Sequence, residues 1–256
     1  MAGHQRIGAA DLRLSLLSAD QTPGGRNVDW RIKGGFLFAK LSRKLAGHWY
    51  GGLNLRVVDA DQTFEPSEAS LEFDLGSHVR SAGIGASAEY DARDMPMNTY
   101  SGRYFKVDAL FNDESLGSDK TYQSYSLAYR SYHELTDSLV LAWEVQGCKR
   151  GGTTPLWDAC MIKLRGFSVT DYLGTETASG QLEARWRLNE RWGLVGFAGS
   201  GYVGNPFSDV RDHNPVPSYG AGVRFMVLKA KRINLRIDYA RSEDSDAIHV
   251  AVGEAF

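Results

Sequence analysis

Alternation of apolar and polar side chains is the feature that most constrains the fold of this 256-residue chain. Within residues 181–188, Leu182 and Trp186 alternate with Glu183 and Arg185. The same period of two recurs in residues 28–40, 103–112, 138–147, 218–229 and 232–242. Because this period places successive side chains on opposite faces of a β-strand, the predicted fold class is all-β.

The two faces of these segments differ in charge. Polar faces carry Arg, Lys, Asp and Glu, whereas apolar faces are almost free of charge and rich in aromatic residues. In residues 28–40 the expected apolar face comprises Trp30, Ile32, Phe36 and Phe38, opposite Arg31 and Lys33. A small water-soluble barrel fills its interior with apolar side chains, whereas a transmembrane barrel turns them outward to lipid. Alternation alone fits both, so a soluble β-sandwich or lipocalin-like barrel is the alternative.

Two observations favour lipid on the outside. Aromatic residues gather at strand ends, as in the interfacial girdles of membrane barrels: Trp186 and Trp192 flank a tight turn, Trp49 follows another, and Tyr90 precedes a third. Connections also alternate between short ones, at 45–47, 133–137, 189–191 and 230–231, and long ones, at 62–79, 149–178 and 204–217. Short periplasmic turns and long extracellular loops are typical of outer-membrane barrels.

We therefore predict a transmembrane antiparallel up-and-down β-barrel of about twelve strands in the bacterial outer membrane, with residues 1–256 as one domain. The expected strands are 9–18, 28–40, 48–60, 80–91, 101–112, 121–132, 138–148, 178–188, 192–203, 218–229, 232–242 and 247–256. The facing of 192–203 is ambiguous because glycines stand at Gly196, Gly199 and Gly201, and glycine inside a strand usually marks curvature or close backbone approach.

Composition excludes several function classes. The formal net charge is -2 at pH 7 and charged residues make up 23%, so no polybasic face indicates a nucleic-acid partner. The sequence contains none of the common hydrolase, metalloprotease or phosphate-loop motifs. The histidines, such as His78 and His249, are scattered. We expect no cofactor, no metal site and no catalytic residues.

Cys148 and Cys160 are the only two cysteines, and both lie in the long 149–178 connection or at its start. Export to an oxidising compartment favours a disulfide between them. A metal or redox site of the C-x-x-C type is the alternative, but the spacing and partner residues for it are missing. The disulfide would stiffen the entry to the loop.

The last predicted strand ends the chain on Phe256, with Ile248, Val250 and Val252 expected on the same face. A terminal aromatic residue on an amphipathic strand resembles the sorting signal read by the bacterial barrel-assembly machinery. This machinery is therefore an expected partner during biogenesis. The alternative is a terminal phenylalanine without such a role.

Four segments carry a family resemblance. Tyr90-Asp91-Ala92-Arg93-Asp94-Met95-Pro96 looks like a Y-D-x-R-D-x-P turn, and Leu164-Arg165-Gly166-Phe167, with the preceding residues 155–160, resembles an (L/V/I)-R-G-(F/Y) loop tip. Residues 180–183 match G-x-x-E, and residues 253–256 match a frequent chain ending. In this order and spacing they resemble the BamA/TamA-type outer-membrane assembly superfamily, in a short surface-antigen-type form without POTRA domains.

The resemblance implies that the loop tip, with Arg165, Gly166 and Phe167, folds back into the barrel lumen. A buried guanidinium needs a carboxylate partner, and Glu183 on the following strand is the candidate. The family often supplies a second acid from an F-x-D-x-G segment, but here residues 197–201 read Phe-Ala-Gly-Ser-Gly. We therefore expect the loop to be held less tightly or differently. A solvated Arg165 in an extracellular loop is the alternative.

The turn residues Asp91, Arg93 and Asp94 have two interpretations. The favoured one is a turn cap that satisfies backbone groups. The other is a conformational lock at the periplasmic rim.

The function that the resemblance implies is a non-enzymatic assembly or translocation barrel. It would have a seam between residues 11–18 and 247–256 that opens laterally, because an unpaired strand edge in lipid is strained. Outer-membrane lipids, a periplasmic POTRA-bearing or chaperone partner, and a second copy of the chain bound through the seam are the expected partners. A small pore or passive structural barrel is the main alternative, and an outer-membrane hydrolase, for which no constellation stands out, is a third.

Overall fold

The computed structural model describes residues 6–16, 28–66, 77–167, 172–206, 215–243 and 245–256. Its strands are β1 (Arg6–Leu16), β2 (Val28–Ala46), β3 (Trp49–Pro66), β4 (Ser77–Asp91), β5 (Gly102–Asn112), β6 (Tyr122–Thr136), β7 (Leu139–Gly152), β8 (Cys160–Met161), β9 (Leu173–Arg187), β10 (Trp192–Pro206), β11 (Val216–Leu228), β12 (Ile233–Ser242) and β13 (Asp246–Val252). Three single-turn 3₁₀ helices are η1 (Glu114–Leu116), η2 (Leu156–Asp158) and η3 (Lys229–Lys231). Among the described helices, none has the length and apolarity needed to cross a membrane.

Twelve of these strands follow one another as an antiparallel meander, in the order β1 to β7 and then β9 to β13, and the two-residue β8 pairs with the start of β9. This confirms the predicted all-β class and the count of twelve. Most strands extend a few residues further than expected. The predicted first strand is shifted, since β1 ends at Leu16 and the expected residues 17–18 lie outside the described part of the chain.

Side-chain exposure confirms the predicted orientation of the sheet. Leu182 and Trp186 on β9 are 50% and 53% exposed, whereas Glu183 and Arg185 between them are 0% and 5% exposed. The same division holds in β12, where Ile237 is exposed and Asp238 is completely buried. In β9 and β12 the charged residues therefore face the inside of the curved sheet, which we call the lumen face, and the apolar residues face outward, as in a transmembrane barrel.

The ambiguous strand β10 follows this rule. Val195 and Phe197 are buried on the lumen face, whereas Leu194 and Tyr202 are exposed on the outer face. Its glycine Gly201 also faces inward, where a Cβ atom would lie 2.6 Å from the Ile162 side chain. Glycine at this position therefore makes room for the loop that precedes β9.

The predicted facing of β2 was wrong. Phe38 pairs with Arg56 in the uninterrupted part of the β2–β3 register, so both side chains lie on one face. Arg56 points into the lumen, where it binds Asp158. Phe36 and Phe38 thus share the lumen side, and Leu37 and its odd-numbered neighbours take the outer side. Both faces of this segment carry large apolar residues, so alternation alone could not decide between them.

The predicted last strand, 247–256, was too long. β13 ends at Val252, and Gly253 adopts a φ of 92°, which lets the chain turn out of the sheet. Phe256 therefore does not continue the outer face of Ile248 and Val250. It is 8% exposed and packs on the lumen face against Tyr132 and Ala142.

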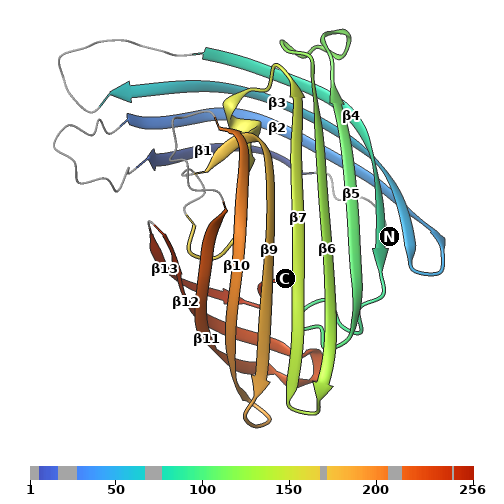
Figure 1. Ribbon diagram of the computed structural model, residues 1–256. Helices are drawn as coiled ribbons and strands as arrows, with labels where there is room; N and C mark the ends of the chain where they lie inside the picture. Colours follow the sequence, from blue (N-terminus) through green and yellow to red (C-terminus); the bar gives the residue numbers. More distant parts are fainter. Residues whose placement is uncertain (1–5, 17–27, 67–76, 168–171, 207–214, 244) are drawn as a thin grey trace.

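The sheet is strongly curved (Figure 1). β1 to β3 sweep across the top of the view, β5 to β9 run down the front, and β11 to β13 tilt across the lower left. The pairing path begins at β1 and ends at β13, and no register among the described residues joins these two strands. They form the two edges of the sheet.

Candidate functional site

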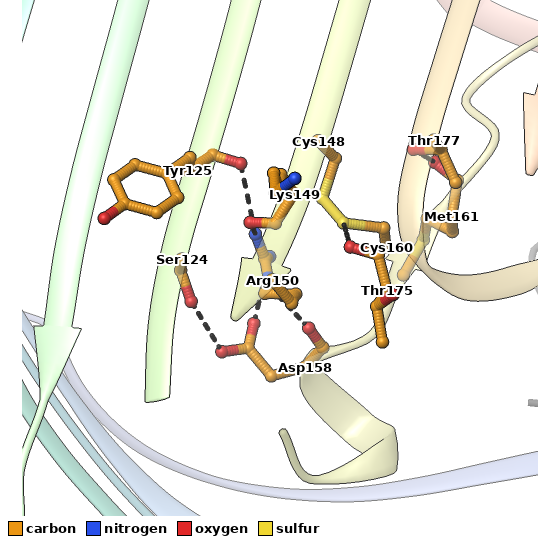
Figure 2. Close-up of a disulfide and its surroundings, with 10 residues drawn as sticks. All are labelled: Ser124, Tyr125, Cys148, Lys149, Arg150, Asp158, Cys160, Met161, Thr175 and Thr177. Atoms are coloured by element: carbon orange, nitrogen blue, oxygen red, sulfur yellow. Dashed lines mark hydrogen bonds and ion pairs between the residues drawn. A yellow bond between two sulfur atoms is a disulfide. The ribbon is translucent and has the colours of Figure 1, made fainter. Parts of the chain in front are cut away.

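The connection between β7 and β9 enters the concave side of the sheet, and its base is held by the Cys148–Cys160 disulfide, with Cα atoms 5.7 Å apart. Figure 2 shows this bond beside Asp158, where η2 ends. The predicted disulfide is confirmed. It ties the loop to the lumen-facing row of β7.

Asp158 forms a second attachment at the loop base, which we call the Asp158 brace. Its carboxylate accepts hydrogen bonds from Arg56 on β3 at 2.5 Å, Arg150 on β7 at 3.2 Å and Ser124 on β6 at 3.3 Å, and the last two are drawn in Figure 2. The Arg56 guanidinium also lies 5.6 Å from the Trp157 ring centroid. The brace joins the loop to three strands. The sequence analysis did not identify it.

Arg165, near the loop tip, is 7% exposed and lies inside the sheet. Its Nη2 donates to Glu183 and, at 2.7 Å, to Gln181 on β9, while its Nη1 donates to Asp238 on β12 at 3.0 Å. The guanidinium stacks on the Phe197 ring at 3.4 Å from the centroid. The geometry differs from a solvated loop arginine, because the cation has two carboxylates and an aromatic face around it.

Asp238 supplies the second acid that was missing from residues 197–201. It stands on the polar face of β12, which was visible in the sequence, but nothing local indicated that it would meet Arg165. The family motif places an acid on the strand that here contributes Phe197. In this chain β10 provides the aromatic ring of Phe197 instead, and β12 provides the negative charge of Asp238.

The contacts of Arg165 belong to a larger buried set, which we call the Arg165 network. Glu183 also accepts from Arg185 at 2.5 Å, and Asp238 accepts from Arg224 at 2.5 Å. Arg224 in turn donates to Glu254 at 2.8 Å. Each carboxylate is nearly or fully buried, at 0 to 3% side-chain exposure. Buried charges are tolerated only when paired and hydrogen-bonded in this way.

Gly166 and Phe167 complete the loop tip. Gly166 has a φ of 88°, and a Cβ atom there would lie 3.0 Å from the Arg241 backbone, so both conformation and space require glycine. Its carbonyl accepts from Ser242 at 2.9 Å and from Ser245 at 2.6 Å. Phe167 joins a buried apolar cluster with residues Ile162, Leu164, Tyr172, Val203 and Val216.

The loop tip also reaches the last strand. The Gly166 amide lies 3.4 Å from His249 Nε2 on β13, in hydrogen-bonding geometry. The tip therefore contacts β12, the β12–β13 turn and β13 itself, next to the edge of the sheet. His249, one of the scattered histidines of the sequence, is therefore a contact of the loop.

The C-terminal tail occupies the lumen at the other end of the same network. The Phe256 carbonyl accepts from Arg185 at 3.1 Å, and the Glu254 carboxylate accepts from Asn234 at 2.6 Å. The Glu254 amide donates to the Met97 carbonyl at 3.3 Å. The C-terminal tail therefore contacts both the Arg165 network and the segment between β4 and β5.

That segment contains the Y-D-x-R-D-x-P turn. Arg93 makes a two-point ion pair with Asp91, at 2.9 and 2.8 Å, and lies 4.4 Å from the Tyr104 ring centroid. Asp94 accepts from the Tyr100 amide at 3.0 Å and also pairs with Arg232. The turn is therefore capped from within, and one of its acids connects it to the β11–β12 turn.

Tyr90 and Pro96 of the same motif take different places. Tyr90 lies on the outer face of β4, with its ring centroid 5.2 Å from that of Trp49. Pro96 lies in the connection after β4, outside any strand. Across the described part of the chain, no group of three or more His, Cys, Asp or Glu residues has a metal-binding arrangement.

One protein-family model matches the chain. The Omp85 superfamily domain model matches residues 32–256. Among solved structures, the chain is similar to BamA from Haemophilus ducreyi lacking POTRA domains 1-3, with a TM-score of 0.72 and 12% identity, over 96% of this chain and 57% of that chain. At this identity the likeness shows the fold alone.

A second solved structure is the CymD monoaromatic hydrocarbon channel, with a TM-score of 0.39 and 10% identity, over 98% of this chain and 77% of that chain. No curated protein matches the sequence.

Proposed function

The chain belongs to the Omp85 superfamily, as its motif pattern predicted, and from this membership we propose that it is a non-enzymatic outer-membrane barrel that inserts or translocates other polypeptides. Its β1 and β13 edges would form a seam that opens laterally. An incoming strand would then pair with an exposed edge through backbone hydrogen bonds.

The observation that carries this proposal is that the two edge strands of the sheet are not paired with each other. The described pairing path ends at β1 on one side and β13 on the other. β13 has only seven residues, and Ile248, Val250 and Val252 on its outer face are 64 to 71% exposed. A short strand with one free edge has few backbone hydrogen bonds to lose when the seam opens, which favours lateral opening.

The Arg165 network would set the geometry beside this seam. It fixes the loop to β9 and β12, and the loop tip contacts β13 through Gly166 and His249. We propose that Arg165, Gly166, Phe167 and Glu183 act as a loop lock, with Asp238 as its second acid. The lock would hold β12 and β13 in register while the β1 side moves.

The partners follow from the same function. The barrel-assembly machinery would read Phe256 before folding, because the folded tail is buried. A periplasmic POTRA-bearing protein or chaperone would deliver clients to the turn containing Asp91, Arg93 and Asp94. A second copy of the chain would cap the free edges through the seam when no client is present.

Cysteine pairs across the seam test the proposal. Single cysteines at Ala9 or Asp11, which pair with the outer-face row of β2, are combined with one at Val250, and the full chain is oxidised in cells that depend on it. We expect crosslinking to abolish client insertion and reduction to restore it. Full function in a crosslinked barrel would contradict lateral opening. The matched control is a pair at Val107 and Leu127, which already face one another in the β5–β6 register and should crosslink without loss of function.

A cavity supports the second candidate, a small pore. About 480 Å³ lies between the loop and the walls of β5 to β7 and β9, with Lys106, Arg130 and Lys163 in its lining. Conductance in planar bilayers should then rise when Asp158→Asn loosens the loop base. Equal conductance of the natural chain and the Asp158→Asn variant would favour a pore that the loop does not gate. If neither protein conducts, this candidate function is contradicted.

A further inference from the structure

The outer face of β2 to β5 bears a hollow that the proposed function does not use. It has a volume of about 680 Å³, and its lining includes Leu41, Leu53, Leu55, Ile84 and Phe111. All five side chains are 41 to 70% exposed. The hollow is almost wholly apolar and lies on the side of the sheet that faces hydrocarbon in a membrane barrel.

The strand registers explain why the surface is hollow here. One row across the four strands pairs Ala39 with Leu55, Ile84 and Phe111 in turn. The next row contains Leu41, Leu53, Ala86 and Ala109. Ala86 and Ala109 in the second row are therefore surrounded by larger side chains, namely Leu41 and Leu53 in the same row and Ile84 and Phe111 in the first row. The depression follows from this difference in side-chain size.

An arginine follows in the third row. Arg43 pairs with Gly51, which pairs with Ala88. Arg43 is therefore on the outer face, two residues beyond Leu41 and opposite Gly51, above which the Leu45 side chain lies. It is exposed, and within the described residues it has no ion-pair partner. An unpaired cation on a lipid-facing surface is unfavourable unless it reaches the interface and an anion there.

The fourth row marks the level of the interface. Trp49 pairs with Tyr90, and Tyr90 pairs with Phe105. The ring centroids of Trp49 and Tyr90 are 5.2 Å apart, and those of Trp49 and Phe105 are 6.4 Å apart. Such a belt lies at headgroup depth. Arg43 stands one row inside it, within reach of a phosphate, at the end of the barrel with the short turns. Figure 1 shows the β2–β3 turn of this end at the right of the view.

We propose that this face binds an anionic phospholipid of the periplasmic leaflet, with an acyl chain in the hollow and its phosphate on Arg43. The inference rests on the membrane placement in the proposed function. Charge complementarity identifies the ligand, because the outer-face row next to the hollow carries Arg43, an exposed guanidinium that has no ion-pair partner among the described residues.

A second outer hollow provides an internal control. About 550 Å³ lies over β7 to β11, lined by residues that include Ala184, Leu194, Gly196 and Ala221 and by no Lys or Arg. This hollow should accept acyl chains without regard to the headgroup. Both hollows are apolar, and the first has Arg43 in the adjoining row of the outer face.

The experiment uses the full chain in phosphatidylcholine nanodiscs that contain photoactivatable phosphatidylglycerol or photoactivatable phosphatidylcholine as the probe. Labelled peptides are identified by mass spectrometry. We expect peptides around Leu41, Leu53 and Ile84 to take several-fold more label from the glycerol lipid than from the choline lipid. Peptides of the β7–β11 hollow should show a ratio near one.

Variants separate charge from shape. Arg43→Gln should bring the first ratio close to one, Arg43→Lys should retain most of the preference, and Ala86→Leu should lower labelling by both probes. Lys231→Gln, in a turn away from the hollow, should change nothing. A ratio of one in the natural chain, no effect of Arg43→Gln, or crosslinks to a second protein chain would each overturn the lipid site.

Heat-modifiable migration of the same samples distinguishes the two proposals. A chain that inserts and migrates as a folded barrel but shows no headgroup preference contradicts only the lipid site. A chain that does not enter the bilayer contradicts both the lipid site and the proposed function.

Discussion

The strands on the two sides of the lumen are stabilised differently. β9 to β12 present a dense set of buried charges, with Glu183, Arg185, Arg224 and Asp238 all 5% exposed or less. The described lumen-facing residues of β2 to β4 include small ones such as Ala60, Ser81 and Ser87, and their charges form fewer ion pairs, among them Lys40–Glu89 and Arg56–Asp158. The comparison indicates a barrel with one wall held by a dense network of buried ion pairs and one wall held by fewer ion pairs.

The loop between β7 and β9 makes more contacts with one wall than with the other. Its tip is tied to β9, β12 and β13, whereas it reaches the N-terminal wall through the contact of Asp158 with Arg56. Movement of β1 to β3 away from the loop would therefore break one ion pair of the loop, Arg56–Asp158, whereas movement of β9 to β13 away from the loop would break the two ion pairs of Arg165. This asymmetry is what the proposed seam requires, because one edge has to move while the other stays in place.

The largest loss of stability is expected when the Arg165 network in β9 to β12 is disrupted. Arg165→Ala leaves Glu183 and Asp238 with one fewer counter-charge in a buried site, which costs on the order of 3–5 kcal/mol. The loop should become sensitive to protease, and the midpoint of urea unfolding of the detergent-folded barrel should fall. Lys149→Gln, which removes an exposed ion pair with Glu176, is the control and should leave the unfolding midpoint nearly unchanged, because solvent screens such a pair. Equal midpoints for the two variants would contradict the lock.

Removing the disulfide should have the next largest effect. A Cys148→Ser, Cys160→Ser double variant frees a loop base whose cysteines are 12 residues apart, and such a bond contributes about 2–4 kcal/mol. Reduction of the natural chain should lower the unfolding midpoint by the same amount as the double variant. A midpoint that is insensitive to reductant would show that the Asp158 brace alone is sufficient.

Breaking the connection to the N-terminal wall should cost less. Arg56→Gln removes one of three partners of Asp158, and Arg150 and Ser124 remain, so we expect about 1–3 kcal/mol. Its specific signature is greater separation of β3 from the loop, measured by spin labels at Val57 and Lys163. The same labels in Lys106→Gln should report an unchanged distance, and a shift there as well would mean that the lumen wall responds to any loss of charge.

The smallest effect concerns pH at the periplasmic turn. Burial raises the pKa of Asp94, but the Arg232 ion pair and the amides of Tyr100 and Ser101 lower it more, so it lies below the ordinary aspartate value. A lowered folded-state pKa stabilises the protein above the unfolded value of about 4 and loses that contribution as pH falls through the folded value. The Asp94→Asn variant should therefore have a lower free energy of unfolding than the natural chain at neutral pH. It should also lose less stability than the natural chain when the pH falls below about 4. Asp137→Asn is the control. Identical acid curves for natural and Asp94→Asn chains would contradict this assignment.

Much of the architecture could be predicted because its causes are local. Alternation identifies strands wherever one face is charged and the other is not, as around Glu183, and the two cysteines leave a single possible intramolecular bond. Prediction failed in β2, where Phe38 and Leu37 are equally apolar and the pairing of β3 at Arg56 decides which of them faces inward. It failed again at Phe256, because a glycine with positive φ ends the last strand early.

The sequence by itself determined the twelve strands, the outward direction of most apolar faces, the disulfide and the likeness of the loop tip to a known family. Only the tertiary structure decided that Asp238 completes the surroundings of Arg165, that Asp158 reaches Arg56, and that the C-terminal tail joins the same charges. The physical reason is that a period of two specifies a face but not a partner. Which residues meet across the lumen depends on strand stagger and sheet curvature, and these arise only when all the strands are paired.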